Sequence, residues 1–199
     1  MSDTTNRQLK SAVLWVAILN GLYFFVEFGA GLATHSVSLI ADSIDFLEDA
    51  SLNVLILVGF ALAGAARARL GSVLAIIIGV PSLAALIAAV DKVLNPIAPS
   101  VQGMSLAAFG ALVVNSVAAL ILMRVRNHEH SLVTAAWLSA RNDVLANVAI
   151  LAAAGATALV ASTWWDVAIG LVIGYLNADA AVKVWRQSRR DLTASDAAP

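Results

Sequence analysis

Residues 37–63 read VSLIADSIDFLEDASLNVLILVGFALA, an apolar run that is interrupted by acidic side chains. Four carboxylates stand within it, at Asp42, Asp45, Glu48 and Asp49. An apolar run of about 20 residues is long enough for a helix to cross the hydrocarbon of a bilayer. Carboxylates at that depth are costly unless they face a cavity, a proton or a cation. The stretch therefore predicts a transmembrane helix with a functional polar face.

Five further apolar runs lie near 11–33, 70–91, 102–123, 132–160 and 164–185. Of the 199 residues, 60% are hydrophobic and only 13% are charged, and the mean hydropathy is +0.86. A soluble domain carries about 25% charged residues. The sequence therefore predicts an all-α membrane protein with six transmembrane helices. Residues 1–190 are expected to form this domain, and residues 191–199 a short polar cytoplasmic tail.

The composition also excludes several classes of function. There are no cysteines, and hence no disulfide framework, thiolate metal ligand or cysteine nucleophile. The formal net charge of −1 gives no basic excess for a nucleic-acid partner. The sequence contains no nucleophile–base arrangement, phosphate-binding loop or cofactor motif. It predicts neither an enzyme nor a resident cofactor.

The basic residues predict the orientation of the six spans. Ten of the twelve Lys and Arg residues fall on one side of the predicted topology: Arg7, Lys10, Arg67, Arg69, Arg124, Arg126, Lys183, Arg186, Arg189 and Arg190. The opposite side carries only Lys92. The positive-inside rule then places both termini in the cytoplasm, and a bacterial-type inner membrane is the expected location. Asp91 and Asp166 are expected to be solvated at the outer surface.

The acids of the 37–63 span are expected near the middle of the bilayer. At 1.5 Å per residue from the outer end, Asp45 lies roughly 12 Å deep and Asp49 roughly 18 Å deep. At 100° per residue, Asp42, Asp45 and Asp49 share one stripe of the helix, with Glu48 on its flank. A structural network of ion pairs or hydrogen bonds is the alternative. Few Lys or Arg residues are available in the spans to form such a network, so the stripe of acids favours binding of a positive charge that comes from outside the protein.

The 132–160 span brings a further carboxylate to the same depth. It contains AAWLSARNDVLANVAILAAA (135–154), and Asp143 lies roughly 16 Å from its cytoplasmic end. Since this span runs antiparallel to the first, Asp143 can join Asp45 and Asp49 around one ion. Three carboxylates nearly neutralise a divalent cation, whereas without it they repel one another and favour protonation. Metal binding therefore releases protons, which predicts exchange of metal for protons.

An asparagine follows an aspartate by four residues in each of these two spans. Asn53 follows Asp49, and Asn147 follows Asp143. Hydrogen bonding to the ligand carboxylates is the expected role. Hydrogen bonding between helices is the alternative.

These residues resemble the cation diffusion facilitators, a family of six-span metal transporters that are usually metal/proton antiporters exporting metal from the cytoplasm. The resemblance covers nearly the whole chain. It rests on NGLYFFVEFGAGLATHSVSLIADSIDFLEDASLN (20–53), on the Asn-Pro pair at 95–96 and on WWDVAIGLVI (164–173). It implies that Asp45 and Asp49 are metal ligands of the second helix and that Asp143 is a ligand of the fifth.

Two features depart from the family pattern. The usual fifth-helix motif is His-x-x-x-Asp or Asp-x-x-x-Asp, whereas here Ser139 precedes Asp143. Ser139 is expected to bind the ion directly or through water, unless Asn142 replaces it as fourth ligand. This oxygen-rich set leans toward Mn²⁺ or Fe²⁺, while Zn²⁺, Co²⁺, Ni²⁺ and Cd²⁺ stay open. The short tail is also too short for the family's C-terminal cytoplasmic domain, so a homodimer would form through the membrane region.

The expected function is thus transport of a divalent metal cation, in exchange for protons and in the efflux direction. Two alternatives stay open from the sequence. One is a membrane scaffold or metal sensor whose buried acids are structural. The other is a proton-coupled transporter of a small organic cation.

Overall fold

The computed structural model of the chain describes residues 3–59, 65–125 and 131–176, and the single positions 179, 182 and 186. Within these residues six helices and no strands are present. Their bounds are α1 Asp3–Thr34, α2 Val37–Gly59, α3 Ala65–Leu94, α4 Val101–Val125, α5 Ser131–Val160 and a shorter C-terminal helix, Trp164–Leu176. The predicted all-helical fold is therefore confirmed, with one helix on each apolar run. Residues 60–63 and 177–185 of two predicted spans lie largely outside the described part.

The turn between α1 and α2 is closed by two consecutive capping arrangements. His35 adopts a left-handed backbone conformation with φ of 54°. The Ser36 N–H donates to the Gly31 carbonyl at 2.9 Å, and the His35 N–H to the Leu32 carbonyl at 3.4 Å, which ends α1 in a Schellman motif. The Ser36 hydroxyl then accepts the Leu39 N–H at 3.2 Å and begins α2. These bonds fix α2 antiparallel to α1.

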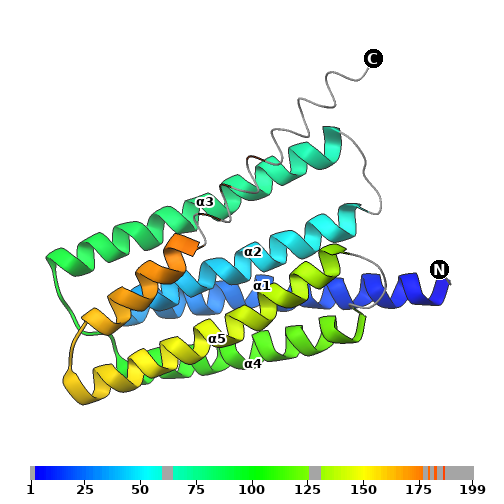
Figure 1. Ribbon diagram of the computed structural model, residues 1–199. Helices are drawn as coiled ribbons and strands as arrows, with labels where there is room; N and C mark the ends of the chain where they lie inside the picture. The colour runs from blue at the N-terminus through cyan, green and yellow to red at the C-terminus, as the bar shows by residue number, and fades with distance from the viewer. Residues whose placement is uncertain are drawn as a thin grey trace.

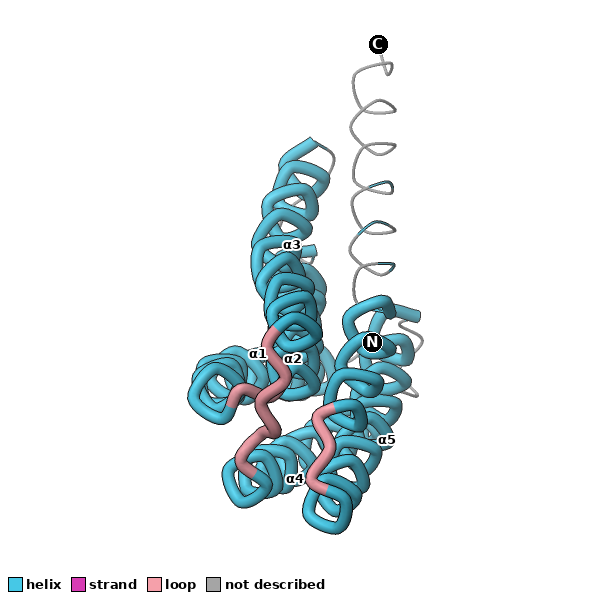
Figure 2. The backbone as a smooth tube through the Cα atoms, turned by 90° about the vertical axis from the view of Figure 1, so that its left-hand side faces the viewer, coloured by secondary structure: helices cyan, strands magenta, loops and turns pink. Residues whose placement is uncertain are grey.

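Four helices form the centre of the molecule. α1 packs against α2 and α4, and α5 packs against α4 and α2. α3 contacts α2 on the outside of this bundle, as the end-on view shows (Figure 2). α2 and α5 run in opposite directions along the bundle (Figure 1). The C-terminal helix lies against the first half of α2, where Gly170 approaches Val37 and Ser38.

The interior of the described residues contains several apolar clusters and a set of buried polar side chains. One cluster gathers residues such as Leu39, Ile44, Met104 and Ile150. Another gathers residues near the opposite end, such as Val13, Ile56, Leu122 and Ala140. The following polar side chains are also buried: Asn20, Glu27, Asp42, Asp49, Asn53, Asn115 and Asn147.

The outer surface of the bundle is apolar. Phe25, Leu106 and Leu159 are 72%, 68% and 88% exposed. Polar groups inside and large apolar side chains outside are what a lipid environment requires. Three helical segments are long and apolar enough to cross a membrane by length and composition alone: Arg7–Thr34, Val101–Val125 and Ala136–Val160. α2 is also long enough but carries the four carboxylates, so the crossing of all six helices stays a prediction.

Candidate functional site

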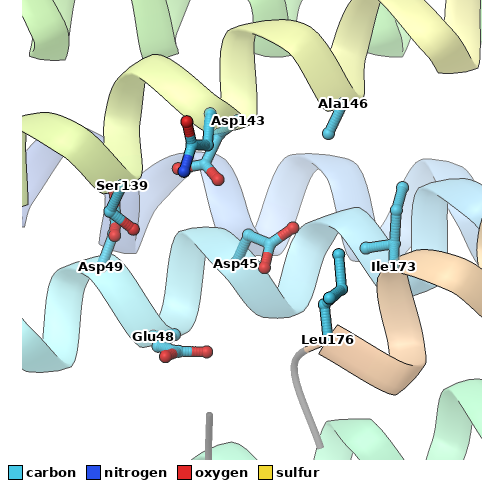
Figure 3. Close-up of a pocket in the computed structure, with 9 residues that line it drawn as sticks. Asp45, Glu48, Asp49, Ser139, Asp143, Ala146, Ile173 and Leu176 are labelled. Atoms are coloured by element: carbon cyan, nitrogen blue, oxygen red, sulfur yellow. The ribbon is translucent and has the colours of Figure 1, made fainter. Parts of the chain in front are cut away.

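A cavity of about 320 Å³ opens between α2, α5 and the C-terminal helix (Figure 3). The four side chains predicted as ligands all line it: Asp45, Asp49, Ser139 and Asp143. Glu48 and Asn142 also line it, and Ala146, Ile173 and Leu176 supply its apolar wall. Residues almost 100 positions apart in the sequence are thus brought to one polar cavity inside an apolar bundle.

The spacing of the lining residues follows from the two helices. Asp45 and Asp49 are four residues apart on α2, and Ser139 and Asp143 are four residues apart on α5, so each pair lies on one face of its helix. Because α2 and α5 are antiparallel neighbours, the two faces oppose each other across the cavity (Figure 3). Asp143 of α5 lines the cavity together with Asp45 and Asp49 of α2, while the depth of these residues in the membrane stays a prediction.

Asp49 is where three helices meet. Its carboxylate lies within hydrogen-bonding reach of the side chains of Ser139 and Asp143. It also accepts a hydrogen bond from Asn20 Nδ2 of α1 at 3.3 Å. Asp49 is 3% exposed. No role was predicted for Asn20 from the sequence, because spacing within α2 does not indicate which face of α1 it meets.

Asp45 is oriented differently. Its carboxylate points along α2 toward Ile173 and Leu176, and away from the Asp49 and Ser139 pair (Figure 3). In the described residues, no group of three His, Asp or Glu side chains is arranged so that it could hold one metal ion. The cavity therefore has its carboxylates in place on the two helices, but they have not converged on a single point.

Glu48 and Asn142 lie at the edges of the cavity. Glu48 projects from the side of α2 that faces away from Asp143 (Figure 3). Asn142 is exposed, and its Oδ1 accepts a bond from Arg141 Nη2 at 3.3 Å. The Arg141 guanidinium also lies 5.5 Å from the centre of the Trp137 ring. Arg141 is thus held against its own helix at the rim.

The other predicted residues make bonds around the cavity. Asn53 donates to the backbone carbonyl of Asp49 at 2.7 Å, not to its carboxylate, because the i, i+4 spacing directs it to its own helix. Asn147 donates to Asp42 Oδ2 at 2.6 Å and accepts from Asn115 Nδ2 at 3.4 Å. It therefore joins α5 to α2 and α4. For Asn147 this agrees with the alternative role, hydrogen bonding between helices, and not with bonding to a predicted ligand. Asp42 is fully buried and does not line the cavity.

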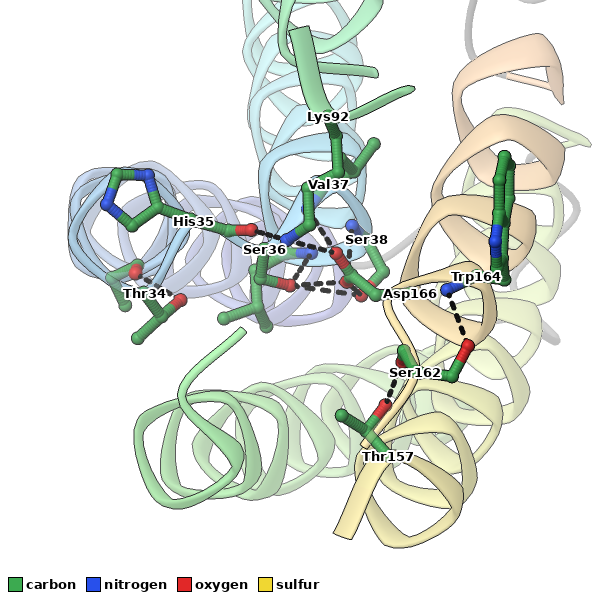
Figure 4. A network of polar contacts seen from close by, with 12 residues as sticks. Thr34, His35, Ser36, Val37, Ser38, Lys92, Thr157, Ser162, Trp164 and Asp166 are labelled. Carbon is green, nitrogen blue, oxygen red and sulfur yellow. Dashed lines mark hydrogen bonds and ion pairs between the residues drawn. The ribbon is translucent and has the colours of Figure 1, made fainter. Parts of the chain in front are cut away.

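A second polar cluster closes the end of the bundle where α2 begins (Figure 4). Asp166 is completely buried and accepts bonds from the Ser36 hydroxyl at 2.7 Å, the Ser38 hydroxyl at 2.6 Å and the Val37 N–H at 2.8 Å. It also pairs with Lys92 Nζ at 3.3 Å. The expectation that Asp166 is solvated was therefore wrong, because its carboxylate caps α2, whereas Asp91 is indeed exposed.

The sequence matches the model of a known protein family over most of its length. The model of a family described as the cation efflux transmembrane domain matches residues 13–193 of the 199. This range includes every residue that lines the cavity. No curated protein matches the sequence.

Proposed function

Because this chain belongs to the cation efflux family, we propose that it carries a divalent metal cation across the membrane through the cavity between α2 and α5. The family and the apolar helices make the chain an integral membrane protein that transports metal cations. The proposal about the site rests on one observation. Asp45, Asp49, Ser139 and Asp143 reach one cavity from two antiparallel helices.

Binding of the ion requires a small rearrangement of these side chains. Asp49 and Asp143 already approach each other across the two helices. Asp45 stands one helical turn away on the same face of α2, so rotation of its side chain brings a third carboxylate to the ion. Three negative charges then surround two positive ones, and the loaded site is nearly neutral in a medium of low dielectric constant. Ser139 adds a neutral oxygen.

The donor set bears on the choice of metal. Carboxylate and hydroxyl oxygens suit harder divalent ions such as Mn²⁺, whereas imidazole and thiolate ligands suit Zn²⁺ and its neighbours. All donors that line the cavity carry oxygen as their ligating atom. We therefore propose Mn²⁺ or Fe²⁺ as the preferred cargo, with Zn²⁺, Co²⁺, Ni²⁺ and Cd²⁺ as competitors.

Protons provide the counter-transport in this proposal. When the ion is absent, two neighbouring carboxyl groups such as Asp49 and Asp143 are stabilised by a shared proton. An arriving cation displaces it, and a proton returning from the other side expels the cation. With six membrane-crossing helices and both termini in the cytoplasm of a bacterial-type cell, an inward proton gradient would drive metal outward. Alternating access would come from rocking of the helices around the cavity.

The test is metal uptake into proteoliposomes by wild type and Asp49→Asn. The substitution removes one negative charge but keeps a side chain of the same shape, so uptake should fall to the background of protein-free vesicles. Asp91→Asn is the matched control, since it makes the same exchange at an exposed position outside the cavity. Metal uptake should also rise when the vesicle interior is more acidic than the outside, because protons leaving the vesicle then drive metal inward.

The same assay separates the remaining possibilities. Uptake by Asp49→Asn equal to that of wild type would remove the cavity from the transport path. Wild-type protein that binds metal but never moves it would indicate a sensor or scaffold. Flux of metal that is indifferent to the pH gradient would eliminate proton exchange.

A further inference from the structure

Glu27 is a buried carboxyl that the metal cavity does not use. It lies on α1, is 0% exposed, and is absent from the residues that line the cavity. Neither of its carboxyl oxygens receives a hydrogen bond from a donor in the described part of the chain. Its nearest charged neighbour in electrostatic terms is the carboxyl group of Asp42 on α2, which is buried in the same part of the bundle. Two carboxyl groups from two helices therefore face each other inside the bundle.

Asp42 is equally enclosed. It is 0% exposed, and its Oδ1 has no donor among the described residues. Its Oδ2 accepts the bond from Asn147 of α5 at 2.6 Å. Asn147 lies one helical turn from Asp143, so one hydrogen bond and one turn of α5 separate the Glu27–Asp42 pair from a residue of the cavity.

The surroundings of the pair contain no compensating cation in the described residues. Tyr23 of α1 is near both carboxyl groups, but its hydroxyl donates to the Ala107 carbonyl at 2.7 Å. The charged neighbours are acidic: Asp45 from α2, and Asp143 from α5. α4 carries one charged residue, Arg124, which is exposed near the end of that helix.

A buried pair of this kind is stable when it holds one proton. Two ionised carboxylates in contact repel each other, and desolvation of each adds to the cost. One proton between them removes a charge and supplies the donor that the oxygens of Glu27 otherwise lack. Unpaired buried acceptors are uncommon in folded proteins and each calls for an explanation.

We propose that Glu27 and Asp42 form a proton-carrying site, separate from the metal cavity, which releases its proton when a divalent cation enters the cavity. The proposal rests on the transport function proposed above. The cation places two positive charges near Asp45 and Asp143, and this favours the doubly ionised pair. The O–H bond breaks, its electron pair stays on the carboxylate, and the proton leaves to water. The pair passes from one negative charge to two.

The experiment counts the protons that purified protein releases when it binds Mn²⁺. Metal is titrated into weakly buffered protein with a pH indicator, and bound metal is measured in the same sample. Glu27→Gln keeps the length of the side chain and can donate to Asp42, but it has no proton to release. It should still bind one ion per site and should release about one proton fewer per ion than wild type. Asp91→Asn should release the wild-type number.

Asp42→Asn provides an independent variant if Glu27→Gln does not fold. It keeps an oxygen acceptor for Asn147 and removes the shared proton from the other partner, so it should show the same deficit. A proton count equal to that of wild type in either folded variant overturns the proposal.

Infrared spectroscopy of metal-free protein tests the same pair without metal. Wild type should show the carbonyl stretches of protonated, buried carboxyl groups. Glu27→Gln should lose the stretch of this pair and keep that of the Asp49 and Asp143 pair in the metal cavity. A spectrum in which neither variant removes such a band contradicts the proposal. The spectrum does not depend on transport. If wild type failed to bind metal, the function proposed for the cavity would be refuted, but the spectrum would still test the Glu27–Asp42 pair.

Discussion

Asp49 illustrates how a single carboxylate can be oriented before an ion arrives. Asn20 of α1 donates to it at 3.3 Å, and Ser139 and Asp143 of α5 lie within hydrogen-bonding reach. Partners that hydrogen-bond a ligand fix its rotamer and typically change metal affinity 10–100-fold when they are removed. Asp45 points away from Asp49 and, in the proposed site, would have to rotate for the three carboxylates to reach one ion.

Ser139 provides a test of selectivity at this scale. It lines the cavity one turn from Asp143. Ser139→His would add an imidazole nitrogen to an oxygen set, and nitrogen donors favour Zn²⁺ over Mn²⁺. The Zn²⁺/Mn²⁺ uptake ratio should therefore rise. Ser139→Ala should weaken uptake only modestly, since water can replace a neutral hydroxyl.

Competitive uptake of the two ions by wild type and both variants measures this effect. An unchanged ratio in an active Ser139→His protein would mean that residue 139 does not face the ion. Asn142 would then be the better candidate for the fourth ligand, although its Oδ1 already accepts a bond from Arg141.

At the scale of helices, several polar contacts from three helices converge on the start of α2. Asp166 caps it from the C-terminal helix and pairs with Lys92 of α3, whose Nζ also donates to the His35 carbonyl. Removing one partner from a buried ion pair typically costs about 3–5 kcal/mol, because the other charge is left unpaired. This cluster therefore fixes three helix ends next to the helix that carries the cavity.

The packing of the C-terminal helix on α2 gives a prediction with its own control. A Cβ atom at Gly170 would lie 2.8 Å from the backbone nitrogen of Ser38, whereas one at Gly174 would lie 4.0 Å from Ala41 Cβ. Backbone atoms cannot yield as a flexible side chain can. Gly170→Ala should therefore lower stability by about 1–3 kcal/mol, and Gly174→Ala should leave it near wild type.

Thermal unfolding of the detergent-solubilised variants measures this difference. Equal midpoints for Gly170→Ala and Gly174→Ala would show that the two helices are not in the contact described. The small-residue stripe at 170 and 174 is visible in the sequence, but only the structure identifies α2 of the same chain as its partner.

For the molecule as a whole, hydropathy alone was enough to predict the helices. Each of the six apolar runs contains one helix, because a long apolar segment satisfies its backbone hydrogen bonds internally. The cavity was also largely predictable. The carboxylates of two antiparallel helices were expected to meet, and all four side chains predicted as ligands line one cavity.

What the sequence could not give was the rotation of each helix about its own axis. The pairing of Glu27 with Asp42 and the bond from Asn20 to Asp49 depend on which face α1 presents to α2. Asp166 was misjudged for the same reason. Its position near a helix start was visible, but the serines at 36 and 38 and Lys92 reach it only through the fold. Spacing within one helix carries no information about such contacts.

The central claim is that Asp45, Asp49 and Asp143 hold the transported cation between α2 and α5. Anomalous diffraction from crystals soaked in Zn²⁺ locates the ion directly. We expect a peak inside the cavity, with Asp45 rotated toward Asp49 and carboxylate oxygens of all three residues at about 2.0–2.2 Å from the metal. A fully occupied ion bound elsewhere, with these three carboxylates still apart, would contradict the account.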